Sequence, residues 1–381
     1  MIPKYFPIMK AKKGELTAYR NLSAETKAHT VPLFEVAQVP KDNKRYSESA
    51  HPVQLYISDV ADQIAEVVGK TSILVDISRW APNATTENGE HILGAIIDEL
   101  ESKGVDVIPV IGYERWEDPE YATLLSSISE IKKSFCIRLE SYAFEDMIEE
   151  NHFYDVLNDI IDSLDLDCSK CIVMLDFSDV TDQPITEIQE VSSRAISILS
   201  KYDFLYVVLA GCSIYSVIND MVPKESSTGY VVRREWMAWK ILKELPHNSH
   251  LVFGDYCITS PQQADGIIAP DANGKIRYTI KDKYYVIRGY SKRKLLKGAQ
   301  MYALCKDLIS SPHYRGTNFS WGDMKINSCA NEEFKGNPTD WIAIDTSHHI
   351  THVVLEVAEF EQNAAAKAAQ GFNFSALIKG T

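Results

Sequence analysis

The sequence has no long apolar run and no segment that looks like a leader. No run approaches the ~18 to 20 apolar residues that a helix needs to cross a bilayer. The amino terminus, MIPKYFPIMKAKKGE, lacks the order of a signal peptide, in which a basic segment precedes an apolar one. We therefore expect no membrane partner and a cytoplasmic location.

Cysteine is scarce in this chain. Seven cysteines, an odd number, are scattered over 381 residues, which argues against a disulfide framework and suits a reducing compartment. Cys168 and Cys171 form a single CxxC pair, without the second pair that a zinc ribbon requires. Because most of the others lie in or beside apolar runs, we expect them to behave as small buried hydrophobes.

Positive charge is also in deficit. Lys and Arg number 39 against 53 Asp and Glu, which gives a formal net charge of −14. Duplex binding depends on neutralising phosphates with Lys and Arg, so we expect no general nucleic-acid binding. Hydrophobic and charged contents of 45% and 24% are ordinary for a globular protein and argue against wholesale disorder.

Several familiar catalytic motifs are missing. The chain contains no GxxxxGK[ST] phosphate loop, no GxGxxG after its first apolar run and no GxSxG nucleophile elbow. It has no HExxH zinc motif either. A functional site must therefore be sought in residues that the fold brings together.

The chain does contain eight short apolar runs between residues 3 and 258. Continuous runs of Val, Ile, Leu and Phe indicate strands that are buried on both faces, as parallel strands covered by helices are. Helix-length segments separate most of them, so the pattern predicts an α/β protein with a closed (β/α)8, TIM-like barrel. The runs are PKYFPIMK, VPLFEV, SILVDIS, DVIPVIG, FCIRLE, CIVMLDFS, FLYVVLAG and HLVFGDYCI.

The pattern changes after the eighth run. Residues 274–290 alternate β-forming residues around a KDK turn, which predicts a hairpin inserted before the last barrel helix, expected at 294–309. We therefore divide the chain into a barrel over 1–310, with its hairpin insertion near 275–289, and a C-terminal extension over 311–381. We expect this extension to pack on the barrel.

Charged residues gather at the predicted strand ends. Barrels of this class place their chemistry at the carboxyl ends of the strands, and five carboxylates with two cations are more than packing alone explains. We therefore predict that these side chains converge on one polar pocket, which binds a ligand or catalyses a reaction. The set comprises Lys10, Glu35, Asp76, Arg138, Glu140, Asp176 and Asp255.

Arg138 admits two interpretations. It stands two residues from Glu140, so both side chains face the same side of the fifth strand. In the first interpretation the arginine fork, together with Lys10, holds a phosphate or carboxylate group of a ligand. In the second, Arg138 forms a structural ion pair with Asp76 or Asp176 on a neighbouring strand, because buried charges must be partnered.

The carboxylates also admit two interpretations. As candidate catalytic residues, Glu35, Asp76 and Asp176 could hold a divalent cation or divide into an acid and a base, with Asp255 as a further ligand-binding residue. Alternatively, they are buried groups that only accept hydrogen bonds from loop amides. The first interpretation predicts a metal-dependent phosphohydrolase or nuclease.

Histidine is concentrated in one segment, SHHITHVV. If a residue at 345–347 caps a helix, then His348, His349 and His352 lie at its start. A helix start that carries imidazoles can bind an anion or a metal. We therefore take His349 as a candidate catalytic base, and His348 and His352 as candidate ligand-binding residues. The alternative is a polar helix cap without further function.

Six segments together resemble the beta protein family of phages, satellite phages and prophage islands. The resemblance runs from about residue 3 to residue 360. It implies a role in excluding competing phages or in restraining a toxin encoded beside the protein, and it implies no catalytic residues. The segments are FPIMKAKKGE, VPLFEV, FGDYCI, IRYT, FSWGD and GNPTDW with HHITHVV.

These expectations combine in a protein of an anti-phage defence locus whose pocket hydrolyses or binds a phosphate-containing ligand, such as a nucleotide or a nucleic-acid end. The alternative is a non-catalytic antitoxin, sensor or partner-binding protein, with exposed aromatic side chains for contacts at Trp236, Trp239 and Trp321. Fold class does not decide between the two.

Overall fold

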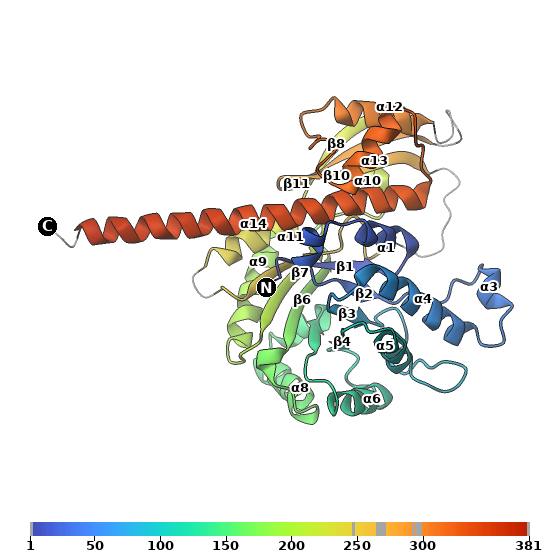
Figure 1. Cartoon of the computed structure of the whole chain (residues 1–381). Helices are drawn as coiled ribbons and strands as arrows, with labels where there is room; N and C mark the ends of the chain where they lie inside the picture. Colours follow the sequence, from blue (N-terminus) through green and yellow to red (C-terminus); the bar gives the residue numbers. More distant parts are fainter. Residues whose placement is uncertain (1–2, 246–247, 264–271, 292, 294–298, 379–381) are drawn as a thin grey trace.

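Eight parallel strands close into a barrel in the computed structural model (Figure 1), which confirms the predicted (β/α)8 fold. The structure describes residues 3–245, 248–263, 272–291, 293 and 299–378, with side chains as far as residue 366. Around the barrel the strands are β1 (Tyr5–Lys10), β2 (Leu33–Glu35), β3 (Ile73–Asp76), β4 (Val107–Gly112), β5 (Cys136–Leu139), β6 (Ile172–Asp179), β7 (Tyr206–Cys212) and β9 (Leu251–Asp255).

Alternation along each strand sorts the side chains into two apolar layers. On β3, Leu74 packs inside the barrel, whereas Ile73 and Val75 pack outside it against helices. Neighbouring strands keep this phase, since Leu33 of β2 pairs with Leu74 in parallel register. The same alternation decides which strand-end side chains reach the barrel interior.

Helices cover the outer layer. In α4 the residues Val60, Ile64 and Val67 are buried on one face, at the spacing of an amphipathic helix. The helical elements that accompany the first seven barrel strands are α1 (Lys13–Arg20), α2 (Ala24–Ala28), α3 (Lys44–Ser47), α4 (Pro52–Val68), α5 (Ile92–Ser102), α6 (Pro119–Ser129), α7 (Ser141–Asp146), α8 (Glu150–Ser163), a 3-10 turn (Cys168–Lys170), α9 (Ile185–Leu199), α10 (Ile218–Met221) and α11 (Arg234–Lys243).

A second sheet is built from insertions that follow β7 and β9, with three antiparallel strands in the order β10-β11-β8. Strands β10 (Asn273–Ile280) and β11 (Lys283–Ser291) form the predicted hairpin, and Asp282 in its turn has a left-handed φ of 60°. The sequence does not predict β8 (Ser227–Val232), because this half-exposed strand contains no continuous apolar run.

The second sheet covers part of the carboxyl end of the barrel. On β11, Tyr284 and Val286 join the apolar cluster of the barrel interior. Tyr285 and Ile287 point to the other face, where they pack with α12 (Gln300–Ile309) and α13 (Trp321–Ala330). Alternate side chains of β11 therefore pack into two different apolar cores.

The helix that packs across β1 and β9 is not the one expected from the sequence. Within the predicted segment 294–309, residues 294–298 lie outside the described part of the chain, and α12 packs on the second sheet. The position beside α1 is taken by α14 (Pro338–Ile378), which runs between the barrel and the second sheet (Figure 1). Its contact with α1 is close, since a Cβ on Gly14 would lie 2.9 Å from Ile342.

Two further expectations concern cysteines and membranes. The cysteines at strands, Cys136, Cys171, Cys212 and Cys257, are free and buried, as predicted. Among the described residues, no helix has both the length and the apolar character needed to span a bilayer. The proposed division of the chain at residue 310 stays a prediction.

Candidate functional site

An arginine lies at the centre of the barrel's carboxyl end. Arg138 follows the inward-facing Cys136 by two residues, and its guanidinium reaches across the interior to strands on the far side. Nη1 donates to Asp76 Oδ2 at 2.6 Å and Nη2 to Glu35 Oε1 at 3.0 Å. Nε and Nη2 both donate to Asp176 Oδ2, at 2.9 and 2.6 Å.

Tyr256 completes this arrangement, which we call the Arg138 ring. Its hydroxyl accepts from Arg138 Nη2 at 2.7 Å and donates to Asp176 Oδ2 at 2.6 Å. All members are buried. The ring consists of Glu35, Asp76, Arg138, Asp176 and Tyr256.

The ring favours the structural interpretation of Arg138. Its guanidinium fills the space between three carboxylates, which is the space that a shared divalent cation would need. Burial by itself raises the pKa of Asp76, but Arg115 and Arg138 outweigh burial and leave that pKa below its ordinary value. The charges therefore compensate one another within the protein.

A second arginine, which the sequence analysis did not single out, lies over the strand end of β4. Arg115 Nη1 donates to Asp76 Oδ1 at 2.6 Å. The guanidinium can take this place only because residue 112 is glycine, since a Cβ on Gly112 would lie 2.1 Å from Arg115 Nε. A glycine at a barrel strand end, followed by Tyr-Glu-Arg, was the available signal.

A third arginine follows β3. Arg79 Nη2 donates to the Pro261 carbonyl at 2.8 Å and contacts Glu35 Oε2 at 3.4 Å. Arg79 Nε and Arg115 Nη2 are buried donors with no hydrogen-bond partner among the described residues. Both guanidinium groups are thus anchored to ring carboxylates, and each keeps one buried nitrogen that no described residue accepts from.

Glu140 lies beside the ring and is partly exposed. Its Oε1 is 3.7 Å from Arg138 Nε, so the predicted proximity of these two residues is observed. Burial raises the pKa of Glu140 to about 7, and the carboxylates of Asp176, Asp76 and Glu114 add to the rise, against the opposing effect of Arg138. Glu140 is therefore a candidate proton donor or acceptor near neutral pH.

Lys10 ends β1 at the same edge of the barrel. It pairs in register with Glu35, and its Nζ donates to the Gln263 carbonyl at 3.0 Å. Nearby, burial raises the pKa of Glu15 to about 8, although Lys10 and Lys12 oppose the rise. Lys10 thus adds a cation to the carboxyl end.

Asp255 does not join the other strand-end carboxylates, so the predicted convergence is wrong for this residue. On β9, Val252 points inward and Phe253 outward. Asp255 therefore has the outward phase, and its carboxylate contacts His349 of α14. The inward place at this strand end belongs to Tyr256.

The histidines do not lie at a helix start, because α14 already begins at Pro338. His348 contacts Asp323 through Nδ1 and the Thr279 carbonyl through Nε2, both at 2.8 Å. His349 and His352 are also buried, and burial lowers the pKa of each. The three histidines are therefore buried side chains inside a helix. Both predictions, an anion site at a helix start and a polar helix cap, are wrong.

Two of the three tryptophans expected at the surface are in the core. Trp236 and Trp239 are 1% and 0% exposed and stack at 5.1 Å between ring centroids. They pack against Phe253 and Phe360, which anchors α14 to α11. Trp321 is half-buried. Trp236 and Trp239 are therefore not available for surface contacts, whereas the expectation for Trp321 stays a prediction.

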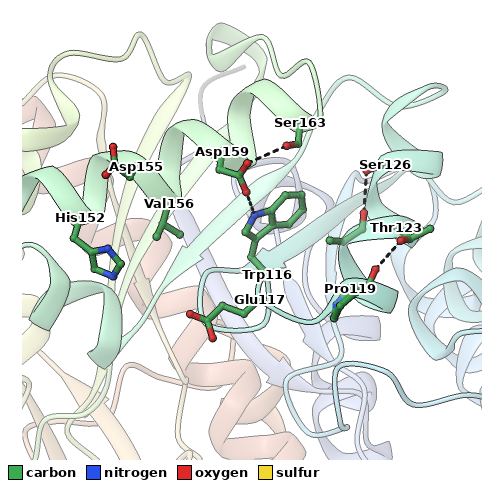
Figure 2. Close-up of a pocket in the computed structure, with 11 residues that line it drawn as sticks. Trp116, Glu117, Pro119, Thr123, Ser126, His152, Asp155, Val156, Asp159 and Ser163 are labelled. Atoms are coloured by element: carbon green, nitrogen blue, oxygen red, sulfur yellow. Dashed lines mark hydrogen bonds between the residues drawn. The ribbon is translucent and has the colours of Figure 1, made fainter.

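A groove of about 650 Å³ lies between α6 and α8, outside the barrel wall. Figure 2 shows Trp116 between the two helices, where its Nε1 donates to Asp159 at 2.6 Å. Its lining mixes apolar and acidic side chains and includes no member of the Arg138 ring. The lining residues are Trp116, Glu117, Pro119, Ala122, Thr123, Ser126, His152, Asp155, Val156, Asp159 and Ser163.

Comparisons with known proteins give one informative match. A family model described as Beta protein matches residues 5–355. Among solved structures, the N-terminal domain of a putative aldolase from Bacteroides vulgatus is similar at 12% identity and a TM-score of 0.36, over 95% of this chain and 99% of that one. No curated protein matches.

Proposed function

The chain belongs to the Beta protein family, and from this premise we propose that it binds an anionic, phosphate-containing ligand at the carboxyl end of its barrel. The observation that carries the proposal is a pair of buried donors, Arg79 Nε and Arg115 Nη2, for which the described part of the chain offers no hydrogen-bond partner. A buried donor without an acceptor costs about 1 to 3 kcal/mol, so a ligand that supplies acceptors gains that amount at each position.

The chemistry of the two guanidinium groups selects the ligand class. Arginine donors match the oxygens of phosphate, and charge-assisted bonds of this kind are the strong ones. Asp76 and Glu35 hold the two groups in place, so little side-chain entropy remains to be lost on binding. We therefore propose a nucleotide or a phosphorylated nucleic-acid end as the ligand.

Binding is better supported than metal-dependent hydrolysis at the ring. Glu35, Asp76 and Asp176 already form ion pairs with Arg138, whose guanidinium occupies the space between them. A divalent cation would have to displace this buried arginine, at a cost of several kcal/mol. The ring therefore positions Arg79 and Arg115 through its carboxylates.

For the biological setting we propose what the family resemblance implies. We place the protein in a phage-exclusion locus, where occupancy of the site reports a phosphate-containing ligand to the rest of the system. Ligand recognition, rather than turnover, is then the event that the barrel performs.

A second candidate function is partner binding through the groove between α6 and α8. Trp116, Pro119 and Val156 give the groove an apolar lining, and Asp155 and Asp159 give it negative charge (Figure 2). An apolar and negatively charged lining suits a basic segment of a partner protein, such as a toxin, which we take as the occupant. The groove is separate from the ring, so both functions can coexist.

A thermal-shift panel tests the ligand proposal. The panel contains inorganic phosphate, pyrophosphate, ATP, GTP and a 5′-phosphorylated oligonucleotide. The same oligonucleotide without its phosphate is the control. A ligand present at 100 times its Kd adds about 2.7 kcal/mol to the free energy of unfolding, which raises the melting temperature. If no member of the panel stabilises the protein, the proposal is wrong.

A further inference from the structure

We propose that Asp255, Cys257 and His349 bind one divalent transition-metal ion, with the hydroxyl of Tyr5 in the fourth position. The site lies on the outer side of the barrel wall and joins β1 and β9 to α14. It uses none of the side chains assigned to the anion site and does not depend on that function.

The distances between the donor atoms suit such an ion. His349 Nε2 is 3.0 Å from Asp255 Oδ2 and 3.2 Å from Tyr5 Oη, and Tyr5 Oη is 3.5 Å from Cys257 Sγ. A tetrahedral ion with bonds of about 2.0 to 2.3 Å separates its ligands by roughly 3.3 to 3.5 Å. One ion therefore fits between these atoms with small side-chain shifts.

Surrounding groups orient the ligands. His349 Nδ1 lies 2.8 Å from the Thr279 hydroxyl, which leaves Nε2 directed at Asp255. A hydrogen bond to the far nitrogen is the usual arrangement of a metal-binding imidazole. The Cys257 amide donates to Asp255 Oδ1 at 2.8 Å, which couples the positions of these two ligands.

The backbone at Cys257 supplies a second, independent observation. Its φ of 55° lies in the left-handed region, which a residue with a side chain adopts at a cost of order 1 to 3 kcal/mol. Strained backbone of this kind is found mainly at ligand-binding and active sites, where the surrounding structure holds it in place. In this conformation the sulfur lies 3.5 Å from the Tyr5 hydroxyl and within 4.8 Å of a carboxylate oxygen of Asp255.

The charges balance when a divalent ion is bound. Asp255 and a Cys257 thiolate carry two negative charges, which the ion cancels. Arg233 lies beside the site, with Nη2 3.9 Å from Asp255 Oδ2, and its charge is balanced by an ion pair with Glu356. All three ligands are buried, so an uncompensated charge would be costly here. The thiol proton is released to solvent when the metal binds.

The donor set indicates which metal to expect. One sulfur, one imidazole nitrogen and carboxylate oxygen favour Zn²⁺ or Co²⁺ over Mg²⁺ and Ca²⁺, which prefer oxygen ligands alone. With the fourth position occupied by Tyr5, the site resembles closed, structural zinc sites rather than catalytic ones. Its role is to fasten α14 to the barrel.

Cobalt substitution of the full-length protein tests the site. Co²⁺ bound to a thiolate gives a sulfur-to-metal absorption band, which we expect in the parent and not in Cys257→Ser. Cys212→Ser is the matched control, because Cys212 is also buried and contacts the carbonyl oxygens of Ile214 and Thr259. This variant should keep the band.

A second measurement does not depend on how the variants fold. X-ray absorption at the zinc edge of the parent, loaded with Zn²⁺ and dialysed, should show one sulfur neighbour among nitrogen and oxygen neighbours. Failure of the parent to retain zinc, or a zinc spectrum without sulfur, overturns the proposal. An unchanged cobalt band in a folded Cys257→Ser protein does the same.

Discussion

Arg115 lies over the strand-end position of Gly112, where a Cβ would come within 2.1 Å of the guanidinium nitrogen Nε. The glycine is therefore part of the site, although it has no side chain to contribute. It lets an arginine from the loop after β4 reach Asp76 at the centre of the barrel.

The first prediction follows from this contact. Gly112→Ala forces the guanidinium of Arg115 away from Asp76, and overpacking of this kind costs about 1 to 3 kcal/mol. We expect a moderate loss of stability together with a loss of phosphate-ligand binding. Urea unfolding and ligand titration measure the two effects, and unchanged binding in the variant would contradict this role of Gly112.

The second prediction concerns the ring itself. Arg138→Met leaves three buried carboxylates without their shared cation, and breaking a buried ion pair costs about 3 to 5 kcal/mol. Denaturant unfolding should show a loss in this range. Arg45→Met removes an exposed arginine paired with Asp59, and this control should leave the stability close to that of the parent.

The third prediction concerns pH. The pKa of Glu140 is about 7 in the folded protein, so its carboxyl group is neutral below that pH and negative above it. Anion affinity should therefore fall as the pH rises from 6 to 8. Glu140→Gln should flatten the part of the profile that Glu140 causes, and an identical profile in this variant would assign the effect to another group.

The same shift affects stability with a definite sign. Because the folded pKa of Glu140 lies above its ordinary value of 4.5, the folded state holds the proton more tightly than the unfolded state. Its contribution to stability is complete below pH 4.5 and is lost as the pH rises through 7. The difference in unfolding free energy between parent and Glu140→Gln should follow this course.

The fourth prediction separates the histidines from the anion site. His348→Gln disturbs the contacts with Asp323 and the Thr279 carbonyl, and an unsatisfied buried group costs about 1 to 3 kcal/mol. We expect lower stability with unchanged affinity for phosphate ligands. If the variant binds the ligand more weakly than the parent at an equal folded fraction, His348 takes part in ligand binding and the prediction is wrong.

Much of the barrel could be predicted from apolar runs, because parallel strands buried on both faces leave a continuous signal. The eighth barrel helix could not. Helix α12 and helix α14 both have helical periodicity, and only tertiary packing decides which one covers β1. Strand β8 was missed for a related reason, since a half-exposed strand has no such run.

The site could be predicted for those residues whose inward or outward direction follows from the alternation of side chains along a strand. Glu35, Asp76, Arg138 and Asp176 each continue the inward phase of their strands, and they meet. Asp255 follows the inward Gly254 by one residue, so counting along β9 would have placed it outside. Residues in loops, such as Arg79 and Arg115, follow no strand periodicity, and their positions depend on the loop conformation.

The measurement that tests the central claim most directly is calorimetric titration of the strongest ligand from the phosphate panel into four proteins. These are the parent, Arg79→Met, Arg115→Met and the exposed control Arg45→Met. We expect each of the two site variants to bind at least about tenfold more weakly, which corresponds to 1.4 kcal/mol, and the control to bind like the parent. Equal affinity in all four folded proteins would contradict the anion site.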